Sequence, residues 1–165
     1  MSDLTLRRAT EEDLPFIMET ERLDGYEELV GRWDEPQHRE ALKDKRKVYF
    51  IGQFEAEPIG FTILRGWASP DHVTLLHRIA VAKPGQGYGR RFLFGIVGAV
   101  FRETDAFRLW LGVFPENVRA RRAYEAAGFS TEGIARGISF FRGTHRDQVI
   151  MSILRPDWDR NGTVT

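Results

Sequence analysis

A glycine-rich loop in the middle of the chain limits the possible folds more than any other segment. It reads Pro84-Gly85-Gln86-Gly87-Tyr88-Gly89. The β-branched run Val73–Val81 precedes it, and an apolar stretch ending near Thr104 follows it, so the loop joins a buried strand to a buried helix. Backbone N–H groups and the helix dipole converge at such a helix start. With Lys83, Arg90 and Arg91 beside it, the loop predicts an anion site; the alternative is a tight turn with incidental basic residues.

Two common nucleotide-binding patterns do not fit this loop. The dinucleotide fingerprint requires Gly-x-Gly-x-x-Gly, whereas here the third glycine, Gly89, comes one residue early and several predicted strands precede the loop. Asp105 lies near the distance expected for a ribose-binding acid, but at the exit of the predicted helix. A P-loop needs Gly-Lys-Ser or Gly-Lys-Thr, and neither follows. The loop therefore argues against hydride transfer and nucleotide hydrolysis.

Length and composition predict one globular domain over residues 1–165. The chain lacks cysteine, which excludes disulfides, cysteine-ligated zinc and a cysteine thioester intermediate. The histidines show no metal-ligand spacing, so no metal is expected; those considered are His38, His72 and His145. The first residues do not resemble a signal peptide, and the longest uncharged stretch, Phe92–Phe101, is about half a membrane span. We therefore expect a cytoplasmic protein that does not bind membranes.

Charge is unevenly distributed although its total is zero. Residues 1–47 carry 9 basic and 13 acidic side chains, which leaves 15 basic and 11 acidic side chains over residues 48–165. An anionic ligand is therefore expected with the second part of the chain and a cationic one with the first. Nucleic-acid binding through Arg119, Arg121 and Arg122 has little support from the neutral total, so no nucleic-acid partner is expected.

Hydrophobic periodicity and turn signals predict a mixed α/β sheet. Leu4, Leu6 and then Arg7-Arg8 predict a short first strand. The other predicted strands are Val48–Phe54, Ile59–Leu64, Val73–Val81, Arg108–Phe114, Phe129–Phe141 and Arg146–Leu154. The predicted helices are Glu11–Thr20, one or two short helices within Tyr26–Lys47, the apolar stretch after Gly89, and Asn117–Ala127, which Gly128 closes.

A second motif begins at Asn117. It reads Asn117-Val118-Arg119-Ala120-Arg121-Arg122-Ala123-Tyr124-Glu125-Ala126-Ala127-Gly128-Phe129. On a helix, Asn117, Ala120 and Tyr124 share one face, and Asn117 can cap the helix. That face combines a small residue, which permits close approach, with a phenol. Taken alone, the segment also fits an amphipathic helix with a core tyrosine.

Together the two motifs resemble those of the GCN5-related N-acetyltransferases (GNAT). The family's first motif has Arg or Gln, two residues, Gly, one residue, and Gly or Ala; here Gly87 and Gly89 occupy the small positions, and Pro84 replaces the usual Arg or Gln. The second motif matches the family's Asn-x-x-Ala-x-x-x-Tyr-x-x-x-Gly-Phe pattern. Its wording and the hairpin around residues 146–152 look like the branch of ribosomal-protein N-terminal acetyltransferases.

The resemblance implies an α/β (α+β) fold with a mixed, mostly antiparallel sheet of about seven strands flanked by helices. It implies acetyl-CoA or coenzyme A as the cofactor. The residues expected to hold its pyrophosphate are Gly85, Gln86, Gly87, Tyr88, Gly89 and Arg90. The strand before the loop is expected to splay and offer backbone groups of Ile79 and Val81 to the pantetheine arm, which Asn117 helps to place.

The resemblance also implies that Tyr124 is the acid that protonates the departing thiolate. A phenol has a pKa of about 10 and a thiol one of about 8.5, so this transfer costs only about 2 kcal/mol. Backbone N–H near Ile79–Val81 is expected to polarise the thioester carbonyl. Many relatives carry Glu where this strand has Leu75. His77, two residues on, is the candidate base, and a strand histidine without catalytic duty is the alternative.

Acceptor recognition is expected from residues 21–40 and the loops Gly66–His72 and Arg136–His145. The residues considered for a cationic amine are Glu21, Asp24, Glu27 and Glu28, with Tyr26 and Trp33 as apolar walls. The absent Glu mildly favours an N-terminal α-amine or another amine of low pKa, which needs less help to lose a proton.

We thus predict an acetyl-CoA-dependent N-acetyltransferase that moves an acetyl group directly to a primary amine, either a protein N-terminus or a small amine. A homodimer is possible. The alternative is a non-catalytic acyl-CoA-binding regulatory module with the same fold.

Overall fold

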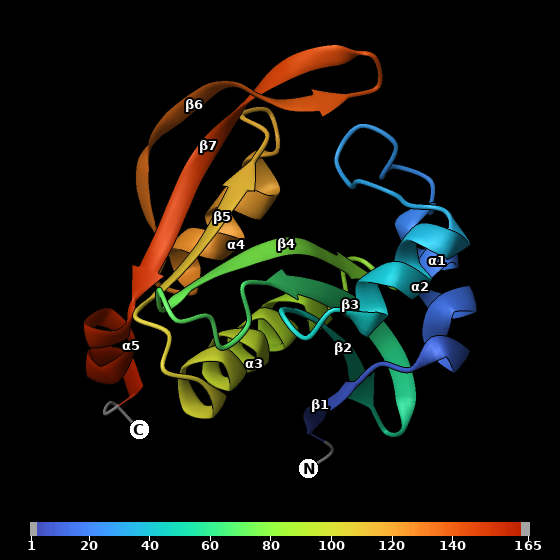
Figure 1. Ribbon diagram of the computed structural model, residues 1–165, viewed down its shortest axis with the longest axis horizontal. Helices are drawn as coiled ribbons and strands as arrows, with labels where there is room; N and C mark the ends of the chain where they lie inside the picture. The colour runs from blue at the N-terminus through green and yellow to red at the C-terminus, as the bar shows by residue number, and fades with distance from the viewer. Residues whose placement is uncertain (1–2, 163–165) are drawn as a thin grey trace.

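A seven-stranded sheet in the order β1-β2-β3-β4-β5-β7-β6 organises the computed structural model, which describes residues 3–162 (Figure 1). The strands are β1 (Leu4–Arg8), β2 (Lys47–Phe54), β3 (Glu57–Arg65), β4 (Val73–Val81), β5 (Arg108–Val113), β6 (Ser130–Phe141) and β7 (Thr144–Leu154). The helices are α1 (Leu14–Glu21), preceded by the 3₁₀ turn η1 (Glu11–Asp13), then α2 (Glu35–Lys43), α3 (Tyr88–Glu103), α4 (Val118–Ala126) and α5 (Arg155–Gly162). The expected mixed, mostly antiparallel sheet flanked by helices is confirmed.

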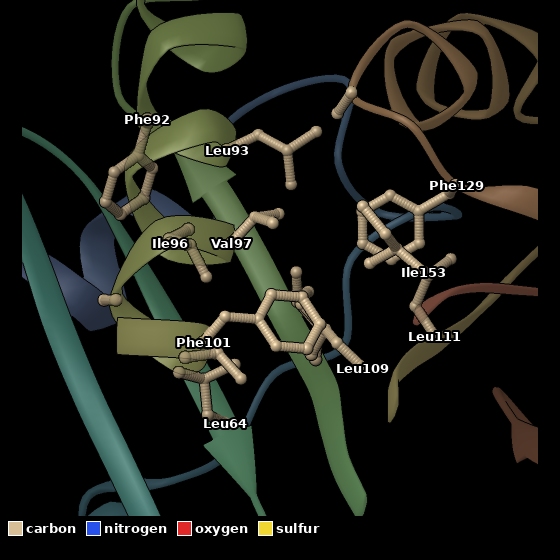
Figure 2. Close-up of a cluster of buried hydrophobic side chains, with 14 of the residues drawn as sticks. Leu64, Phe92, Leu93, Ile96, Val97, Phe101, Leu109, Leu111, Phe129 and Ile153 are labelled. Carbon is tan, nitrogen blue, oxygen red and sulfur yellow. The ribbon is translucent and has the colours of Figure 1, made fainter. Parts of the chain in front are cut away.

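The glycine loop leads directly into α3, whose buried side chains form the main hydrophobic core together with residues of the sheet. Its buried residues recur at helical spacing and point toward the sheet (Figure 2). They include Phe92, Leu93, Ile96, Val97, Val100 and Phe101, and they pack with Leu64, Leu109, Leu111, Phe129 and Ile153. Burying each large apolar side chain contributes roughly 1.5–3 kcal/mol. The start of α3 is therefore fixed by the packing of the rest of the helix.

The opposite face of the sheet is covered by α1 and α2. Leu14, Ile17 and Ala41 pack there on residues of β2, β3 and β4. Neighbouring residues of β2 belong to different clusters, because Tyr49 faces α1 and α2 whereas Phe50 faces α3. A strand covered on both faces explains the continuous apolar run in β2.

Two segments differ from the sequence prediction, whereas α2 agrees with the prediction of one or two short helices within Tyr26–Lys47. The first predicted helix begins as η1, where the Asp13 carboxylate accepts the Thr10 N–H at 2.8 Å. Helix α5 was not predicted, because it depends on distant partners: the Arg155 guanidinium donates to the carbonyl oxygens of Phe101, Thr104 and Ala106 at 2.8–2.9 Å. Among residues 3–162, no helix is long and apolar enough to cross a membrane.

Candidate active site

The site is built around a gap between β4 and β5, the parallel pair of the sheet. They pair only from Val73–Leu75 of β4 to Arg108–Trp110 of β5, and they diverge beyond that point (Figure 1). The chain leaves the open end of β4 into the glycine loop and leaves the open end of β5 toward α4. Both sequence motifs therefore follow the open end of the gap.

The free edge of β4 in this gap consists of backbone groups. Ala82 N donates to Ile59 O at 2.7 Å, and the register continues with Ala80 opposite Phe61. Alternation along an antiparallel pair then turns the N–H and C=O of Ile79 and Val81 away from β3, into the gap. These two residues can offer hydrogen bonds to an elongated ligand.

A β-bulge lies in β4 next to this edge. Ile63 pairs with Arg78 but Leu64 pairs with Leu76, so His77 is the extra residue. Before the bulge Leu76 packs on the α3 side, whereas after it Ile79 packs there and Ala80 packs under α1 and α2. The bulge thus places His77 beside Trp33, with ring centroids 5.5 Å apart, on the face away from α3.

The glycine loop has the geometry of an anion cradle. Gly85 and Gly87 have φ values of 85° and 80°, a region that favours glycine. A Cβ built on either residue would face open space, so a ligand can approach the backbone closely. Gly87 begins α3 without a side-chain cap, which leaves the first helical N–H groups available to an anion. Gln86 and Arg90 are exposed.

Tyr88 differs from the other loop residues. Its ring packs on Phe54, with centroids 5.3 Å apart, and against the main core. The part of Tyr88 that the loop can present to an anion is therefore its backbone N–H. These observations fit the pyrophosphate of coenzyme A, which needs several N–H donors and nearby positive charge.

The second motif forms α4 as expected. Asn117 Oδ1 accepts the Ala120 N–H at 3.2 Å and caps the helix. Tyr124 lies on the inner side, partly buried against the main core, with its ring centroid 5.8 Å from that of Phe129. Burial raises the pKa of Tyr124 to about 12, so its hydroxyl remains protonated at neutral pH.

His77 is a neutral imidazole at neutral pH. Burial and then the positive charges of Arg78, Arg65 and Lys47 lower the pKa of His77 to about 4. A neutral ring can accept a proton, but a group with this pKa is a weak base. His77 thus lies on β4 at the gap, but with this pKa it is a poor acceptor for the proton of an ammonium group.

The segment between α1 and α2, residues 22–34, crosses the open end of the gap. On one side the Tyr26 hydroxyl donates to the carbonyl oxygen of Val81 at 2.8 Å. On the other side the tip of the β6–β7 hairpin approaches the same segment (Figure 1). There Arg142 forms an ion pair with Glu28, and Arg146 donates to Glu28 O at 3.2 Å. The open end of the gap is thus bordered by this segment and the hairpin.

The acidic residues of this segment, and Glu21 just before it, do not all play the part predicted from sequence. Glu21 is fully buried and holds four partners, so the prediction that it attracts an acceptor amine is wrong. Glu28 is exposed but paired with Arg142 and Arg146. Asp24 and Glu27 remain exposed, and two backbone N–H groups lower the pKa of Glu27.

Loop Gly66–His72, predicted to contact the acceptor, lies elsewhere. It enters β4 at the closed end of the gap, where His72 O accepts the N–H groups of Phe107 and Arg108 at 2.8 and 3.2 Å. In the part of the chain that the structure describes, no cluster of His, Cys, Asp or Glu could hold a metal ion.

Sequence reasoning missed several residues that shape the site. Arg146 lies over the ring of Phe114, 3.6 Å from its centroid, and pairs with Glu116 as well as Glu28. Arg78 is buried in β4 and pairs with Glu21. A signal was present for Arg78, because an arginine within the apolar run Leu75–Val81 requires a buried partner.

Comparison with known proteins identifies the family. The acetyltransferase (GNAT) family matches residues 12–129. A probable N-acetyltransferase, YjcK of Bacillus subtilis (strain 168), is 29% identical, with 82% of this chain and 78% of that protein covered. An aminoglycoside N(6′)-acetyltransferase type 1 of Klebsiella pneumoniae is 26% identical over 79% of this chain and 75% of that protein.

Solved structures with lower identity share the fold. A spermidine N-acetyltransferase SpeG chimera from Vibrio cholerae and hSSAT has a TM-score of 0.83 and 24% identity, covering 95% of this chain and 98% of that chain. The aminoglycoside acetyltransferase AAC(6′)-Ib, solved in complex with coenzyme A, has a TM-score of 0.82 and 22% identity, covering 98% and 100%.

These relatives do not support the predicted likeness to ribosomal-protein N-terminal acetyltransferases, since they are named for spermidine and aminoglycosides. The motif resemblance itself is confirmed by the family match, which spans the glycine loop and the whole second motif. Relatives of this fold have been solved with acetyl-CoA or coenzyme A bound, and this chain belongs to the acetyltransferase (GNAT) family.

Proposed function

We propose that this protein transfers the acetyl group of acetyl-CoA directly to the primary amine of a small-molecule acceptor, with both substrates bound at once. The observation that carries this proposal is the gap between β4 and β5. The free backbone edge of β4 leads into the glycine loop, and β5 is followed by α4 with Tyr124. The acyl donor is thus assigned to the β4 side of the gap and the proton donor to the β5 side.

Acetyl-CoA supplies an activated acetyl group as a thioester. The start of α3 would hold the pyrophosphate, with Arg90 adding charge, and the backbone of Ile79 and Val81 would hold the pantetheine arm. Asn117 Oδ1 is used as the cap of α4, so its amide Nδ2 is the atom left to orient a ligand. An N–H of β4 that faces the gap would stabilise charge on the thioester oxygen.

The new bond joins the acceptor nitrogen to the acetyl carbon, and the bond from that carbon to sulfur breaks. Tyr124 gives its hydroxyl proton to the sulfur. Its pKa of about 12 would make this transfer cost about 5 kcal/mol against a thiol of ordinary pKa. Apolar surroundings also raise the pKa of a bound thiol, which brings donor and acceptor closer.

The amine must lose one proton in the reaction. His77 is the candidate acceptor of this proton because it is neutral and lies beside Trp33 on β4. With its pKa lowered to about 4, it helps little with a strongly basic ammonium group. Amines that are partly unprotonated at neutral pH are therefore the favoured acceptors.

A small acceptor suits the open end better than a polypeptide does. The segment 22–34 and the β6–β7 hairpin approach each other there through Arg142, Arg146 and Glu28. An extended peptide would have to part these contacts, whereas a small amine needs a narrower opening. Relatives named for spermidine and aminoglycosides support the same class.

The test is the initial rate of CoA release from acetyl-CoA with two acceptor sets. One set contains a polyamine, an aminoglycoside and free amino acids; the other contains short peptides with free N-termini. We expect turnover with a member of the first set, abolished in Tyr124→Phe. Turnover of peptides alone would replace the small-molecule acceptor by a protein N-terminus. Tight acetyl-CoA binding without CoA release from any amine would instead indicate a regulatory module.

A further inference from the structure

A buried polar cluster lies under α1 and α2, on the face of the sheet that carries His77. Glu21, the last residue of α1, is fully buried, as is His38, and Arg78 is 8% exposed. Glu21 accepts from Arg78 Nη1 at 3.0 Å, from His38 Nε2 at 2.8 Å and from Arg22 Nη1 at 2.8 Å. His38 Nδ1 lies 2.7 Å from the Tyr49 hydroxyl.

Both ring nitrogens of His38 are hydrogen-bonded, Nδ1 with the Tyr49 hydroxyl and Nε2 with the Glu21 carboxylate. Burial raises the pKa of Tyr49, so its hydroxyl stays protonated at neutral pH. Burial alone would raise the pKa of Glu21, but the hydrogen bond and electrostatic interaction with His38, followed by the charge of Arg78, outweigh it, and the pKa is lowered. Glu21 is therefore a buried carboxylate.

Stability alone does not account for this cluster. Its surroundings are apolar, with Ile17, Ile51, Phe61 and Ile63 in the same packed layer. Apolar residues of similar volume stabilise such a layer at least as well as a buried ion pair, because both charges must leave water. What the ion pair adds is a fixed arrangement of the segments that it joins.

Those segments are the ones at the open end of the gap. The Trp33 backbone is held at both polar atoms: its N–H donates to Glu21 at 3.2 Å, and its carbonyl accepts from Arg22 Nη2 at 2.8 Å. Arg78 lies over the Trp33 ring, 4.7 Å from its centroid. Gly31 lies against the same guanidinium, where an added Cβ would be 2.8 Å from Nη2. The chain at 31–33 thus wraps around Arg78.

Arg78 also belongs to the cofactor arm of the gap. It follows the bulged residue His77 and precedes Ile79, whose N–H faces the gap. Its guanidinium contacts Glu21, Gly31 and the Trp33 ring, so the side chain ties this part of β4 to the segment that carries the Trp33 wall. We propose that Glu21 and Arg78 are positioning residues: their buried ion pair holds residues 22–34 on β4 and fixes the Trp33 wall along which the acceptor reaches the thioester. Its kinetic consequence rests on the proposed acetyl transfer, whereas its structural consequence does not.

The test uses two variants and one matched control. Glu21→Gln keeps the shape of the side chain and removes its charge, while Gly31→Ala displaces the Arg78 guanidinium and leaves Glu21 intact. The control, Asp13→Asn, breaks the ion pair to Arg7 (2.8 Å) near the start of α1. For each protein we would measure amide hydrogen exchange of residues 22–34 and 77–81, unfolding by urea, acetyl-CoA affinity, and kcat and KM for the acceptor.

We expect both test variants to exchange about tenfold faster over residues 22–34, relative to the α3 core, and to change acetyl-CoA affinity less than about threefold. The acceptor KM should rise about fivefold or more, with a smaller loss in kcat. The control should lose stability without changing the relative exchange or the acceptor KM.

Unchanged relative exchange over residues 22–34 in both test variants would overturn the proposal. So would an equal rise in acceptor KM in Asp13→Asn, because the effect would then follow stability alone. A wild-type protein that releases no CoA with any amine would refute the proposed function, and hydrogen exchange would still decide the role of the ion pair.

Discussion

The two sides of the gap between β4 and β5 are built by different means. The cofactor side uses the backbone of β4 and the glycine loop, residues that adjoin one another in sequence. The acceptor side uses side-chain pairs between distant residues, such as Glu21 with Arg78, 57 positions apart, and Glu28 with Arg146, 118 positions apart. A site made of backbone groups keeps its hydrogen bonds when many of its side chains are replaced. A site made of paired side chains loses a contact with a single substitution.

This difference suggests how one fold keeps its donor and changes its acceptor. Hydrogen bonds from backbone N–H groups depend on the path of the chain, which the core under α3 fixes. The acceptor side instead depends on ion pairs between side chains that are distant in sequence, such as Arg78 with Glu21 and Arg142 with Glu28. Binding of acetyl-CoA should therefore be insensitive to substitutions on the acceptor side.

Tyr124→Phe should have the largest effect and should leave both kinds of binding intact. Removing a general acid typically costs about 10²–10⁴ in rate. The ring remains packed on Phe129, so acetyl-CoA affinity and acceptor affinity should change less than about threefold. Single-turnover rates and calorimetric titration of acetyl-CoA measure the two quantities. Equal losses in rate and in binding would make Tyr124 a packing residue.

The free energy of unfolding should depend on pH, because His77 on the acceptor side has a different pKa in the folded and unfolded states. Its pKa is lowered to about 4 in the folded protein, against about 6.5 when unfolded. The folded state therefore favours the neutral ring. The contribution of His77 to the free energy of unfolding is fully present above pH 6.5 and is lost as the pH falls toward 4. Between pH 7.5 and pH 5 the loss should be about 2 kcal/mol.

The measurement is urea unfolding at both pH values, compared with His77→Gln, which does not titrate. The wild-type protein should lose about 2 kcal/mol more than the variant over this interval. Parallel losses in the two proteins would mean that His77 has an ordinary pKa in the folded state. In that case it would be a stronger base than the structure indicates.

Gly87→Ala tests the cofactor side, with Gly143→Ala as a matched control for acetyl-CoA binding. The two glycines have similar φ values, 80° and 83°, and a Cβ on either would meet nothing within 4 Å. Each substitution should cost about 1–2 kcal/mol of folding stability through backbone strain. Only Gly87→Ala, at the start of α3, should weaken acetyl-CoA binding, by about tenfold. Equal affinities in the two variants would remove the loop from the cofactor site.

The same contrast explains how far the sequence could be interpreted. The glycine loop, the cap at Asn117 and strand β4 are predictable because local sequence determines turns, caps and strand patterns. The bulge at His77 has no local signature, since it depends on the register with β3. The partners of Arg78 and Arg146 depend on which segments the fold brings together, so charge counts in residues 21–40 misjudged Glu21.

Tyr26→Phe should have the smallest effect and tests the separation where the two sides touch. The Tyr26 hydroxyl, whose pKa is raised by burial, donates to Val81 O at 2.8 Å, a group on the cofactor edge. Losing one such bond typically costs about 1 kcal/mol, a factor of about five, so the acceptor KM should rise at most about fivefold. A carbonyl oxygen has two lone pairs, and a pantetheine amide can use the second, so acetyl-CoA affinity should stay within about twofold. Calorimetric titration and steady-state kinetics give both values. A tenfold change in acetyl-CoA affinity would contradict the separation, because residues 22–34 would then form part of the cofactor site.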